Sequence, residues 1–373
     1  MLHQTTDMKW IDGSPCLPSK VTSDEKVDEL RATCARLAEA STASIFPGSQ
    51  PVSLSRSNMG DIASKQFLVC EKTDGVRFLL QVCGREAYFV DRKYEFYPAP
   101  LDSQVLERLE NTLVDGELVL DDVPGEGSRT TFLIFDAIAV KGRFVGDLSL
   151  SDRLRAVRGE VMPPFGATGR IAVGTDFEFT VGLKHMYRKQ DVGLVLSAVL
   201  PALFHENDGL IFTRDDEPYK IGTCDFILKW KPLHLNSVDF LLEVDFRKTA
   251  SEKGGVLEER YCMLKCGNSG QMMSFGYIHI DPAMQATFLK TYSSRPFIAE
   301  CVYDKEWFTL TPPPEAGAPW DSWNLVPGGG WRYLRPRPDK KMPNNIHTVN
   351  NVVDSIKANI VEKDLTDIFA RVE

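Results

Sequence analysis

The stretch from residue 67 to residue 77 is Phe-Leu-Val-Cys-Glu-Lys-Thr-Asp-Gly-Val-Arg. Its apolar start, Phe67 to Cys70, predicts a strand, and Asp74-Gly75 predicts a tight turn that follows directly. Lys72 therefore stands at a strand end, and a second cation, Arg77, follows the turn. Such a lysine is a covalent nucleophile when it faces a cleft where neighbouring cations or desolvation favour the neutral amine. The alternative is an ordinary hairpin turn with an exposed lysine, and the motif alone does not decide between the two.

Further along the chain, four segments place charged groups at strand ends or on strand faces. The acids Asp115 and Glu117 lie in an apolar strand, Asp136 ends another, and Asp208 lies at a turn that enters a third. In Ile227-Leu-Lys-Trp-Lys-Pro232 the alternation predicts that both lysines share one strand face.

A basic run closes this series. The ten residues from 332 to 341 hold five cations, Arg332, Arg335, Arg337, Lys340 and Lys341, against the single acid Asp339. We expect a local anion site there. Together, acids that suit a divalent metal, cations that suit phosphates and a strand-end lysine predict a nucleotide site.

The composition sets limits on these expectations. The 373 residues carry 43 Lys and Arg against 52 Asp and Glu, a net charge of −9, with 43% hydrophobic residues. These values exclude a collagen, a coiled coil, a wholly disordered chain and a globally basic nucleic-acid binder. The longest mostly apolar stretch, Val192 to Phe204, is too short to cross a bilayer, so no membrane partner is expected. The eight scattered cysteines favour reduced core thiols in a cytosolic or nuclear protein over a zinc site.

The hydrophobic pattern along the chain predicts two domains that differ in secondary-structure content. Up to about residue 237, helical periodicity at 23–40 and 186–200 and several short strands indicate a mixed α+β domain. From 238 to 347, five short strands with little helical pattern indicate a small β-barrel. The Pro/Gly-rich segment 311–330 is expected to form a loop or a partly disordered insertion, and 348–373 a helix.

The motif order makes a family resemblance specific. In sequence, KTDG (72–75), DGELV (115–119), FLIFDA (132–137), NDGLIF (207–212), ILKWKP (227–232) and RPRPDK (335–340) resemble the covalent nucleotidyltransferase superfamily. Within it, the chain resembles the mRNA capping enzyme guanylyltransferases, and FPGSQPVS at 46–53 together with VCEKTDGVR resembles their fungal branch. The likeness spans residues 46 to 368, although the insertion at 311–330 has no clear counterpart. It implies a nucleotidyltransferase domain, an OB-fold domain that closes on it, and a tail helix that packs back on the first domain.

The resemblance also implies residue roles. Lys72 would attack the α-phosphate of GTP and then pass GMP to a 5′-diphosphate RNA end. Around the nucleoside, Phe132 would stack on guanine, Lys184 would lie near the guanine O6, Arg77 would contact the ribose or RNA end, and Glu117 the ribose or metal. Around the α-phosphate, Thr73 would lie beside the nucleophile, Arg92 would contact a phosphate, Asp208 would lie at the metal and α-phosphate, and Lys229 and Lys231 would hold the α-phosphate. The pyrophosphate would be contacted by Arg335, Arg337, Asp339 and Lys340.

Cofactors, partners and alternatives follow from the same likeness. It implies Mg²⁺ or Mn²⁺ at Glu117 and Asp208, a separate RNA triphosphatase subunit, the phosphorylated C-terminal tail of RNA polymerase II, and a nuclear location. Two other functions stay open at this point. One is an ATP-dependent polynucleotide ligase of the same superfamily, and the other is a non-catalytic scaffold that docks the polymerase.

Overall fold

Two compact units make up the chain in the computed structural model, which describes residues 10–11, 14–166, 170–171, 177–250, 256–280, 282–292, 295–311 and 324–370. The first unit comprises Met1–Trp230 and Glu362–Glu373, and the second comprises Lys231–Val361. The sequence prediction put this boundary after residue 237. It falls earlier because Asn236, beyond the short 3₁₀ turn Leu233–Leu235, accepts a backbone hydrogen bond from Tyr303 of the second unit at 3.5 Å.

The tail forms two helices where the sequence predicted one. Helix α7 (Ile346–Ala358) ends at Asn359, whose left-handed backbone (φ 46°) breaks the helix, and α8 (Glu362–Ala370) follows. Helix α7 belongs to the second unit and α8 to the first. Asp364 of α8 forms an ion pair with Arg56 at 2.8 Å. The expectation that all of 348–373 packs on the first unit is therefore wrong for α7.

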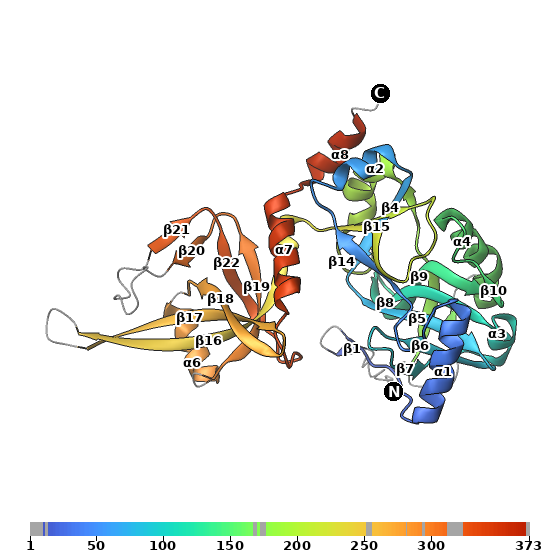
Figure 1. The fold of residues 1–373 in the computed structure, drawn as a ribbon, viewed down its shortest axis with the longest axis horizontal. Coiled ribbons are helices and arrows are strands. Elements are labelled where there is room, and N and C mark those ends of the chain that lie inside the picture. Colours follow the sequence, from blue (N-terminus) through green and yellow to red (C-terminus); the bar gives the residue numbers. More distant parts are fainter. Residues whose placement is uncertain are drawn as a thin grey trace. The chain divides into compact units, whose positions relative to one another are not determined.

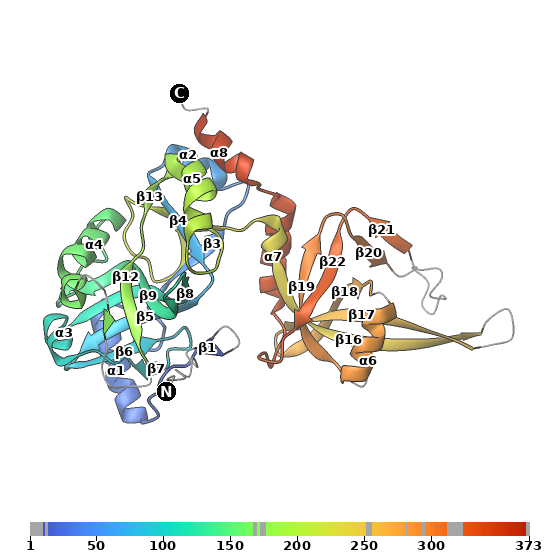
Figure 2. The same ribbon diagram turned by 180° about the vertical axis from the view of Figure 1, so that it is seen from behind.

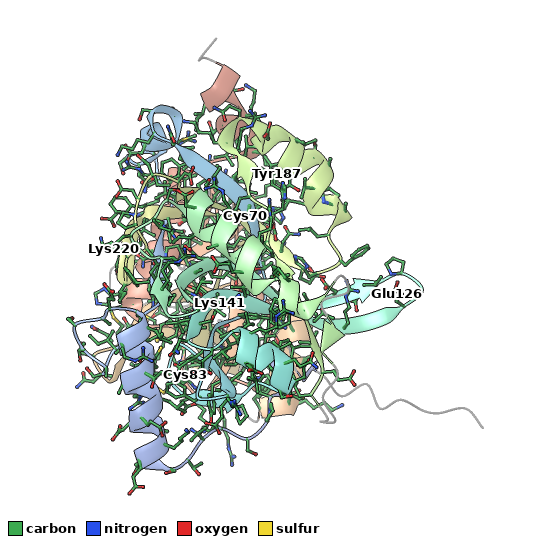
Figure 3. All side chains as sticks on the ribbon, turned by 90° about the vertical axis from the view of Figure 1, so that its right-hand side faces the viewer. Cys70, Cys83, Glu126, Lys141, Tyr187 and Lys220 are labelled. Carbon is green, nitrogen blue, oxygen red and sulfur yellow. The ribbon has the colours of Figure 1, made fainter. Side chains whose placement is uncertain are left out.

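The larger sheet of the first unit has the strand order β11-β12-β9-β8-β5-β6-β7, with β10 paired to β9. Its strands are β5 (Val76–Cys83), β6 (Glu86–Val90), β7 (Phe96–Pro98), β8 (Thr112–Val123), β9 (Gly127–Val140), β10 (Arg143–Phe144), β11 (Arg170–Ile171) and β12 (Phe179–Leu183). The β8–β9 hairpin extends beyond the body of the unit, with Glu126 near its tip (Figure 3).

The second sheet of this unit has the order β13-β4-β14-β15-β3. Its strands are β3 (Ser49–Ser53), β4 (Phe67–Thr73), β13 (Tyr187–Arg188), β14 (Asn207–Arg214) and β15 (Gly222–Trp230). Sequence analysis predicted no strand around residue 50. It missed β3, an edge strand that pairs in parallel with β15 and tolerates Pro51 for that reason.

Helices cover these sheets, as Figures 1 and 2 show. They are α1 (Asp24–Leu37), α2 (Met59–Ser64), α3 (Ser103–Arg108), α4 (Leu150–Ala156) and α5 (Val192–Leu194). The helix predicted at 23–40 is confirmed as α1, and the Ser23 hydroxyl caps it by accepting the backbone N–H of Lys26. Leu30 and Cys34 of α1 pack in one apolar cluster with Leu79 of the larger sheet.

The helix predicted over 186–200 is wrong in form. Tyr187 and Arg188 instead pair with β4 as strand β13. Beyond them lie the 3₁₀ turn Lys189–Asp191, the short α5, a π-helical turn Val195–Val199 and a 3₁₀ turn that contains Pro201. Apolar periodicity indicated a helix, but it did not reveal that pairing with β4 takes the first residues into a sheet.

The second unit is mostly β, as predicted. One sheet has the order β18-β17-β16-β19-β22, and β20 pairs with β21. The strands are β16 (Ser237–Ala250), β17 (Val256–Asn268), β18 (Gln271–Ile278), β19 (Phe297–Asp304), β20 (Phe308–Thr311), β21 (Asn324–Pro327) and β22 (Gly330–Pro336). Helix α6 (Pro282–Tyr292) was missed. Of the predicted loop 311–330, β21 is a strand, and 312–323 lies outside the described residues.

The fold class expected from sequence agrees with this architecture: a mixed α+β domain is followed by a mostly-β domain. All eight cysteines are free thiols. Among the described residues, no helix is long and apolar enough to span a bilayer.

Candidate active site

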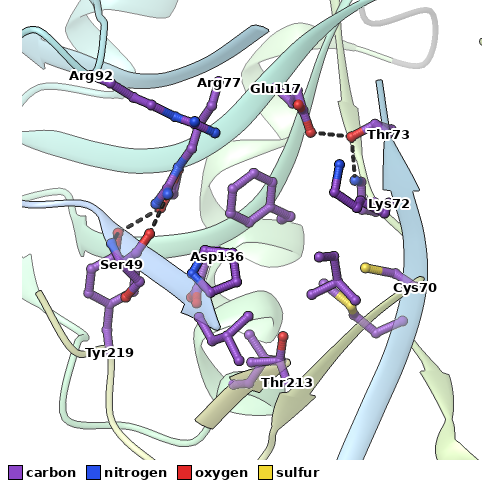
Figure 4. Close-up of a pocket in the computed structure, with 18 residues that line it drawn as sticks. Ser49, Cys70, Lys72, Thr73, Arg77, Arg92, Glu117, Asp136, Thr213 and Tyr219 are labelled. Atoms are coloured by element: carbon purple, nitrogen blue, oxygen red, sulfur yellow. Dashed lines mark hydrogen bonds and ion pairs between the residues drawn. The ribbon is translucent and has the colours of Figure 1, made fainter. Parts of the chain in front are cut away.

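A pocket lies between the two sheets of the first unit. Residues of β3, β4, β14 and β15 line it on one side, and residues of β5, β8 and β9 line it on the other. Figure 4 shows polar side chains in two groups. Arg77 and Arg92 lie together at one end, and Lys72, Thr73 and Glu117 lie together at the other.

Lys72 enters the pocket because of the geometry where β4 ends. Its Nζ lies 2.6 Å from the Oδ1 of Asp208, and its side chain is 22% exposed. The β4–β14 register shifts between the pairs Asn207–Thr73 and Leu210–Glu71, which leaves Asp208 and Gly209 in a bulge near Lys72. Gly209 adopts φ 140°, a conformation that favours glycine.

The Asp-Gly turn beside Lys72 also depends on a glycine. A Cβ at Gly75 would lie 2.4 Å from the backbone oxygen of Leu118, so the backbone of β8 approaches too closely for any side chain. This close approach brings Glu117 of β8 near the end of β4, where Thr73 donates a hydrogen bond to Glu117. The KTDG motif therefore joins the nucleophile strand to the acid strand.

Lys184, which follows β12, completes this polar group. Its Nζ donates to the Oγ1 of Thr73 at 3.0 Å and to the backbone oxygen of Glu71 at 3.4 Å. It also lies 5.6 Å from the ring centroid of Phe135. Lys184 is 5% exposed and lines the pocket, so its ammonium is held by fixed acceptors.

A second network anchors the opposite end of the pocket. The guanidinium of Arg77 donates to both carboxylate oxygens of Asp115, at 2.9 and 2.5 Å, and to the backbone oxygen of Ser49. Tyr219 donates its hydroxyl proton to Asp115 at 2.6 Å and accepts the backbone N–H of Ser49 at 3.0 Å. Burial alone would lower the pKa of Arg77, but the charge of Asp115 outweighs it and raises that pKa. Arg92 lines the same end and is exposed.

Strand register determines which face of the sheet Lys229 occupies, whereas Lys231 lies beyond the end of β15 at Trp230. Cys70, Ile211 and Lys229 lie directly opposite one another on β4, β14 and β15, and directly opposed residues share a face. Cys70 and Ile211 line the pocket, so Lys229 is on the pocket face. Lys231 is the first residue of the second unit, and the structure does not place it relative to this pocket.

The prediction for Phe132 is wrong. Phe132 is 0% exposed, and its ring packs edge-on against Phe89 at 5.2 Å in the core. Phe135 lines the pocket instead, with the Arg77 and Lys184 cations both 5.6 Å from its ring centroid. Glu117 pairs with Leu133, and residues two apart share a face, so Phe135 belongs on the face of Glu117. That signal requires the β8–β9 register, which sequence alone does not supply.

The basic run of the second unit is less cationic than its sequence suggests. Three acids from outside the run and one within it pair with its arginines: Arg332 with Asp304 at 2.7 Å, Arg335 with Glu300 at 2.7 Å, and Arg337 with Asp239 at 2.9 Å and, within the run, Asp339 at 2.8 Å. Lys340 and Lys341 are exposed. The expected anion site is therefore largely neutralised by local carboxylates.

The predicted metal ligands are the carboxylates of Glu117 and Asp208. Within the described ranges, no cluster of three or more His, Cys, Asp or Glu side chains is arranged to hold a cation. Glu117 and Asp208 are two carboxylates on either side of the β4 end, bonded to Thr73 and Lys72 respectively. Mg²⁺ is commonly held by one or two carboxylates together with substrate phosphates. The donor set therefore fits a metal that arrives with a nucleotide, not a preformed cage.

With the fold, this pocket defines the chain as a nucleotidyltransferase. Two family models divide it between them: "mRNA capping enzyme, catalytic domain" matches residues 13–233, and "mRNA capping enzyme, C-terminal domain" matches residues 235–366. The chain therefore belongs to the mRNA capping enzyme family, and its activity is that of an mRNA guanylyltransferase.

Curated relatives agree along nearly the whole chain. The mRNA-capping enzyme subunit alpha of Schizosaccharomyces pombe is 31% identical over 91% of this chain and 84% of that protein. The Saccharomyces cerevisiae protein of the same name is 30% identical over 95% of this chain and 84% of that protein. These relatives decide against the ligase and scaffold alternatives.

Solved DNA ligases are similar to this chain only at a low level. Mycobacterial DNA ligase D, complexed with ATP and MES, is 16% identical with a TM-score of 0.38, over 80% of this chain and 95% of that chain. The Chlorella virus DNA ligase-adenylate is 14% identical with a TM-score of 0.35, over 69% and 94%. Scores at this level add nothing to the functional argument.

Proposed function

We propose that guanylyl transfer in this protein proceeds through a covalent intermediate on Lys72. The Nζ of Lys72 attacks the α-phosphorus of GTP, the N–P bond forms, and the bond to the bridging oxygen breaks to release pyrophosphate. A β-phosphate oxygen of a 5′-diphosphate RNA then attacks the same phosphorus. The N–P bond breaks, and the GpppN cap and the free lysine result. The observation that supports this role is the position of Lys72 in the pocket, beside Asp208, Thr73 and Glu117.

Proton handling at Lys72 falls to Asp208. The Nζ of Lys72 lies 2.6 Å from the Oδ1 of Asp208, and attack on phosphorus requires a free amine. Asp208 is within hydrogen-bond distance of the proton that must leave, so it is the proposed acceptor. The positive charge of Lys229 on the same sheet face, together with Lys231, supports the α-phosphate as negative charge develops.

Base recognition is proposed for Phe135 in place of Phe132. Its ring lines the pocket between two cations, so guanine can stack on it while Lys184 contacts the O6 edge. Glu117 and Arg77 face the ribose, and Arg92 at the exposed end contacts a phosphate or the RNA end. The fixed partners of Arg77 and Lys184 keep both cations in place before GTP binds.

The divalent metal is proposed at Glu117 and Asp208. When bound with GTP, Mg²⁺ or Mn²⁺ supplies charge neutralisation at the phosphates. For this to occur, Asp208 must first release the proton taken from Lys72 to solvent and give up that contact, and Glu117 must share its contact with Thr73. Arg335, Arg337, Asp339 and Lys340 of the second unit are proposed to orient the pyrophosphate leaving group during the first step.

Partners and location are proposed on the family alone. The fungal relatives are named subunit alpha, which indicates a multi-subunit capping enzyme. We expect an RNA triphosphatase subunit to supply the 5′-diphosphate RNA. Docking to the phosphorylated tail of RNA polymerase II, in the nucleus, would bring the enzyme to nascent transcripts.

The intermediate is tested directly by mass. Protein incubated with GTP and Mg²⁺ or Mn²⁺ is expected to gain one GMP on the peptide that contains Lys72. Lys72→Arg is expected to fold but form no adduct, because a guanidinium stays protonated. Lys65→Arg, an exposed lysine on the same unit paired with Asp61, is the matched control and should form normal adduct. An adduct on another residue, or a normal adduct in Lys72→Arg, would contradict the proposal.

A further inference from the structure

A buried histidine lies behind the pocket and does not line it. His205 precedes β14, and its side chain is 8% exposed. Its Nδ1 lies 2.9 Å from the Oδ1 of Asp121 on β8, and its Nε2 lies 3.9 Å from the Oε1 of Glu71 on β4. Glu71 immediately precedes Lys72 in sequence. His205 therefore lies between two carboxylates on strands of different sheets, hydrogen-bonded to Asp121 and within ion-pair distance of Glu71.

The contacts continue from Glu71 to the pocket. The Nζ of Lys184 lies 3.7 Å from the Oε1 of Glu71 and donates to the hydroxyl of Thr73 at 3.0 Å. Thr73 in turn donates to Glu117, which like Asp121 belongs to β8. A continuous series of polar contacts thus runs from Asp121 through His205, Glu71, Lys184 and Thr73 back to β8.

The two carboxylates beside His205 favour its protonated form. Glu71 and Asp121 are only 5% and 6% exposed, and two ionised carboxylates at such sites need compensating charge. Lys184 faces Glu71, and Arg129 lies 3.5 Å from the other oxygen of Asp121. Burial alone would lower the pKa of His205, but Asp121 and Glu71 outweigh it and raise that pKa to about 9. Burial alone would raise the pKa of Glu71, but His205 and the charge of Lys184 outweigh it and lower that pKa.

We propose that His205 is a positioning residue for nucleotide binding. Its imidazolium fixes the carboxylate of Glu71, and Glu71 with Thr73 holds the ammonium of Lys184 in the pocket. His205 acts through Glu71, because His205 and Glu71 are absent from the pocket lining whereas Lys184 and Thr73 belong to it. The inference rests on the proposed function in one respect, namely that GTP occupies this pocket.

The first test separates binding from chemistry. In His205→Gln the amide can still donate a hydrogen bond to Asp121. Glu71, however, loses its cationic neighbour, so its carboxylate no longer holds the ammonium of Lys184 in the same position. We expect the KM for GTP in adduct formation to rise about tenfold, the size of one lost charge-assisted contact. The rate at saturating GTP should stay close to that of the wild type, since Lys72 and Asp208 are untouched.

The second test uses pH, which a purely structural role would not move. A group whose pKa is raised on folding holds its proton until the pH passes the raised value. In the wild type the KM for GTP should therefore stay level through neutral pH and rise above about pH 9, where His205 loses its charge. Asp121→Asn removes one of the two carboxylates, so the rise should begin at lower pH. His205→Gln should lack this rise.

The controls separate failure of this inference from failure of the proposed function. His347→Gln, an exposed histidine of the second unit, should match the wild type throughout. Thermal melting of each variant checks folding, and if His205→Gln does not fold, the shift in Asp121→Asn carries the test. No GMP adduct in the wild type would overturn the proposed function. A normal adduct with unchanged KM in His205→Gln, or an unshifted pH profile in Asp121→Asn, would overturn the role of His205.

Discussion

The pocket of the first unit and the basic run of the second unit use the same residue types in opposite ways. In the pocket, the side chains of Arg77 and Asp115 are 7% and 0% exposed and meet through two hydrogen bonds. In the basic run, Arg335 pairs with Glu300, and its side chain is 63% exposed. Both regions hold arginines paired with acids, but both members of the Arg77–Asp115 pair are shielded from water, whereas the guanidinium of Arg335 is open to it.

This difference determines what each charge can do. A buried ion pair loses most of its compensation when one partner leaves, so the pocket pairs behave as fixed scaffolding. An exposed pair contributes little to stability, and its arginine can exchange a carboxylate for a phosphate at small cost. The pocket is therefore suited to hold a nucleotide in one orientation, and the basic run is suited to contact phosphates transiently.

The largest expected effect comes from breaking a buried pair. Arg77→Gln leaves Asp115 buried without its cation and should lower the free energy of unfolding by about 3–5 kcal/mol. Arg335→Gln, the matched change on the surface, should lower it by about 1 kcal/mol or less. Urea unfolding of both variants measures the contrast. Equal losses of unfolding free energy in the two variants would contradict the distinction between buried pocket pairs and exposed pairs of the basic run.

The two phenylalanines of β9 give the next contrast, within the first unit. Phe132→Ala empties a core position and should cost about 3–5 kcal/mol of stability. Phe135→Ala removes a pocket wall and should instead weaken GTP binding, with about 0.5–1.5 kcal/mol arising from lost stacking geometry. Denaturant unfolding and GTP titration separate these effects. Unchanged GTP affinity in Phe135→Ala would contradict its proposed role.

The smallest expected effect concerns the basic run and is confined to one half-reaction. If Arg337 orients pyrophosphate, Arg337→Ala should slow adduct formation about tenfold, the equivalent of one charge-assisted hydrogen bond. Transfer of GMP from a preformed adduct to diphosphate RNA should change much less, because no pyrophosphate is present. Single-turnover rates of both steps measure this.

The competing account treats the same run as a general RNA-binding patch. It requires near-normal adduct formation, poor transfer and a loss that depends strongly on salt. Lys340→Ala removes an exposed cation of the same run, and its rates of adduct formation and GMP transfer are compared with those of Arg337→Ala. A defect limited to the transfer step in both variants would refute the leaving-group role.

The sequence by itself determined the elements whose causes are local. An apolar run that leads into Asp74-Gly75 indicated a strand ending at Lys72, and Ser23 with helical periodicity indicated α1, because both signals lie within a few residues. The order of the motifs then identified the family and the fold class. Most predicted site residues of the first unit were brought to one pocket: Lys72, Thr73, Arg77, Arg92, Glu117 and Lys184.

Tertiary structure alone decided which groups meet across long separations. The choice between Phe132 and Phe135 depends on β8–β9 pairing with register shifts, and such a shift reverses the face a side chain occupies. One of the two acids that pair with Arg337, Asp239, lies 98 positions earlier, and Asp208 reaches Lys72 across 136 positions through a bulge. The bridge from His205 to Glu71 and Asp121 has the same origin. Local sequence patterns indicate the secondary structure that a segment favours, but only the packing of the strands determines which charged side chains face each other.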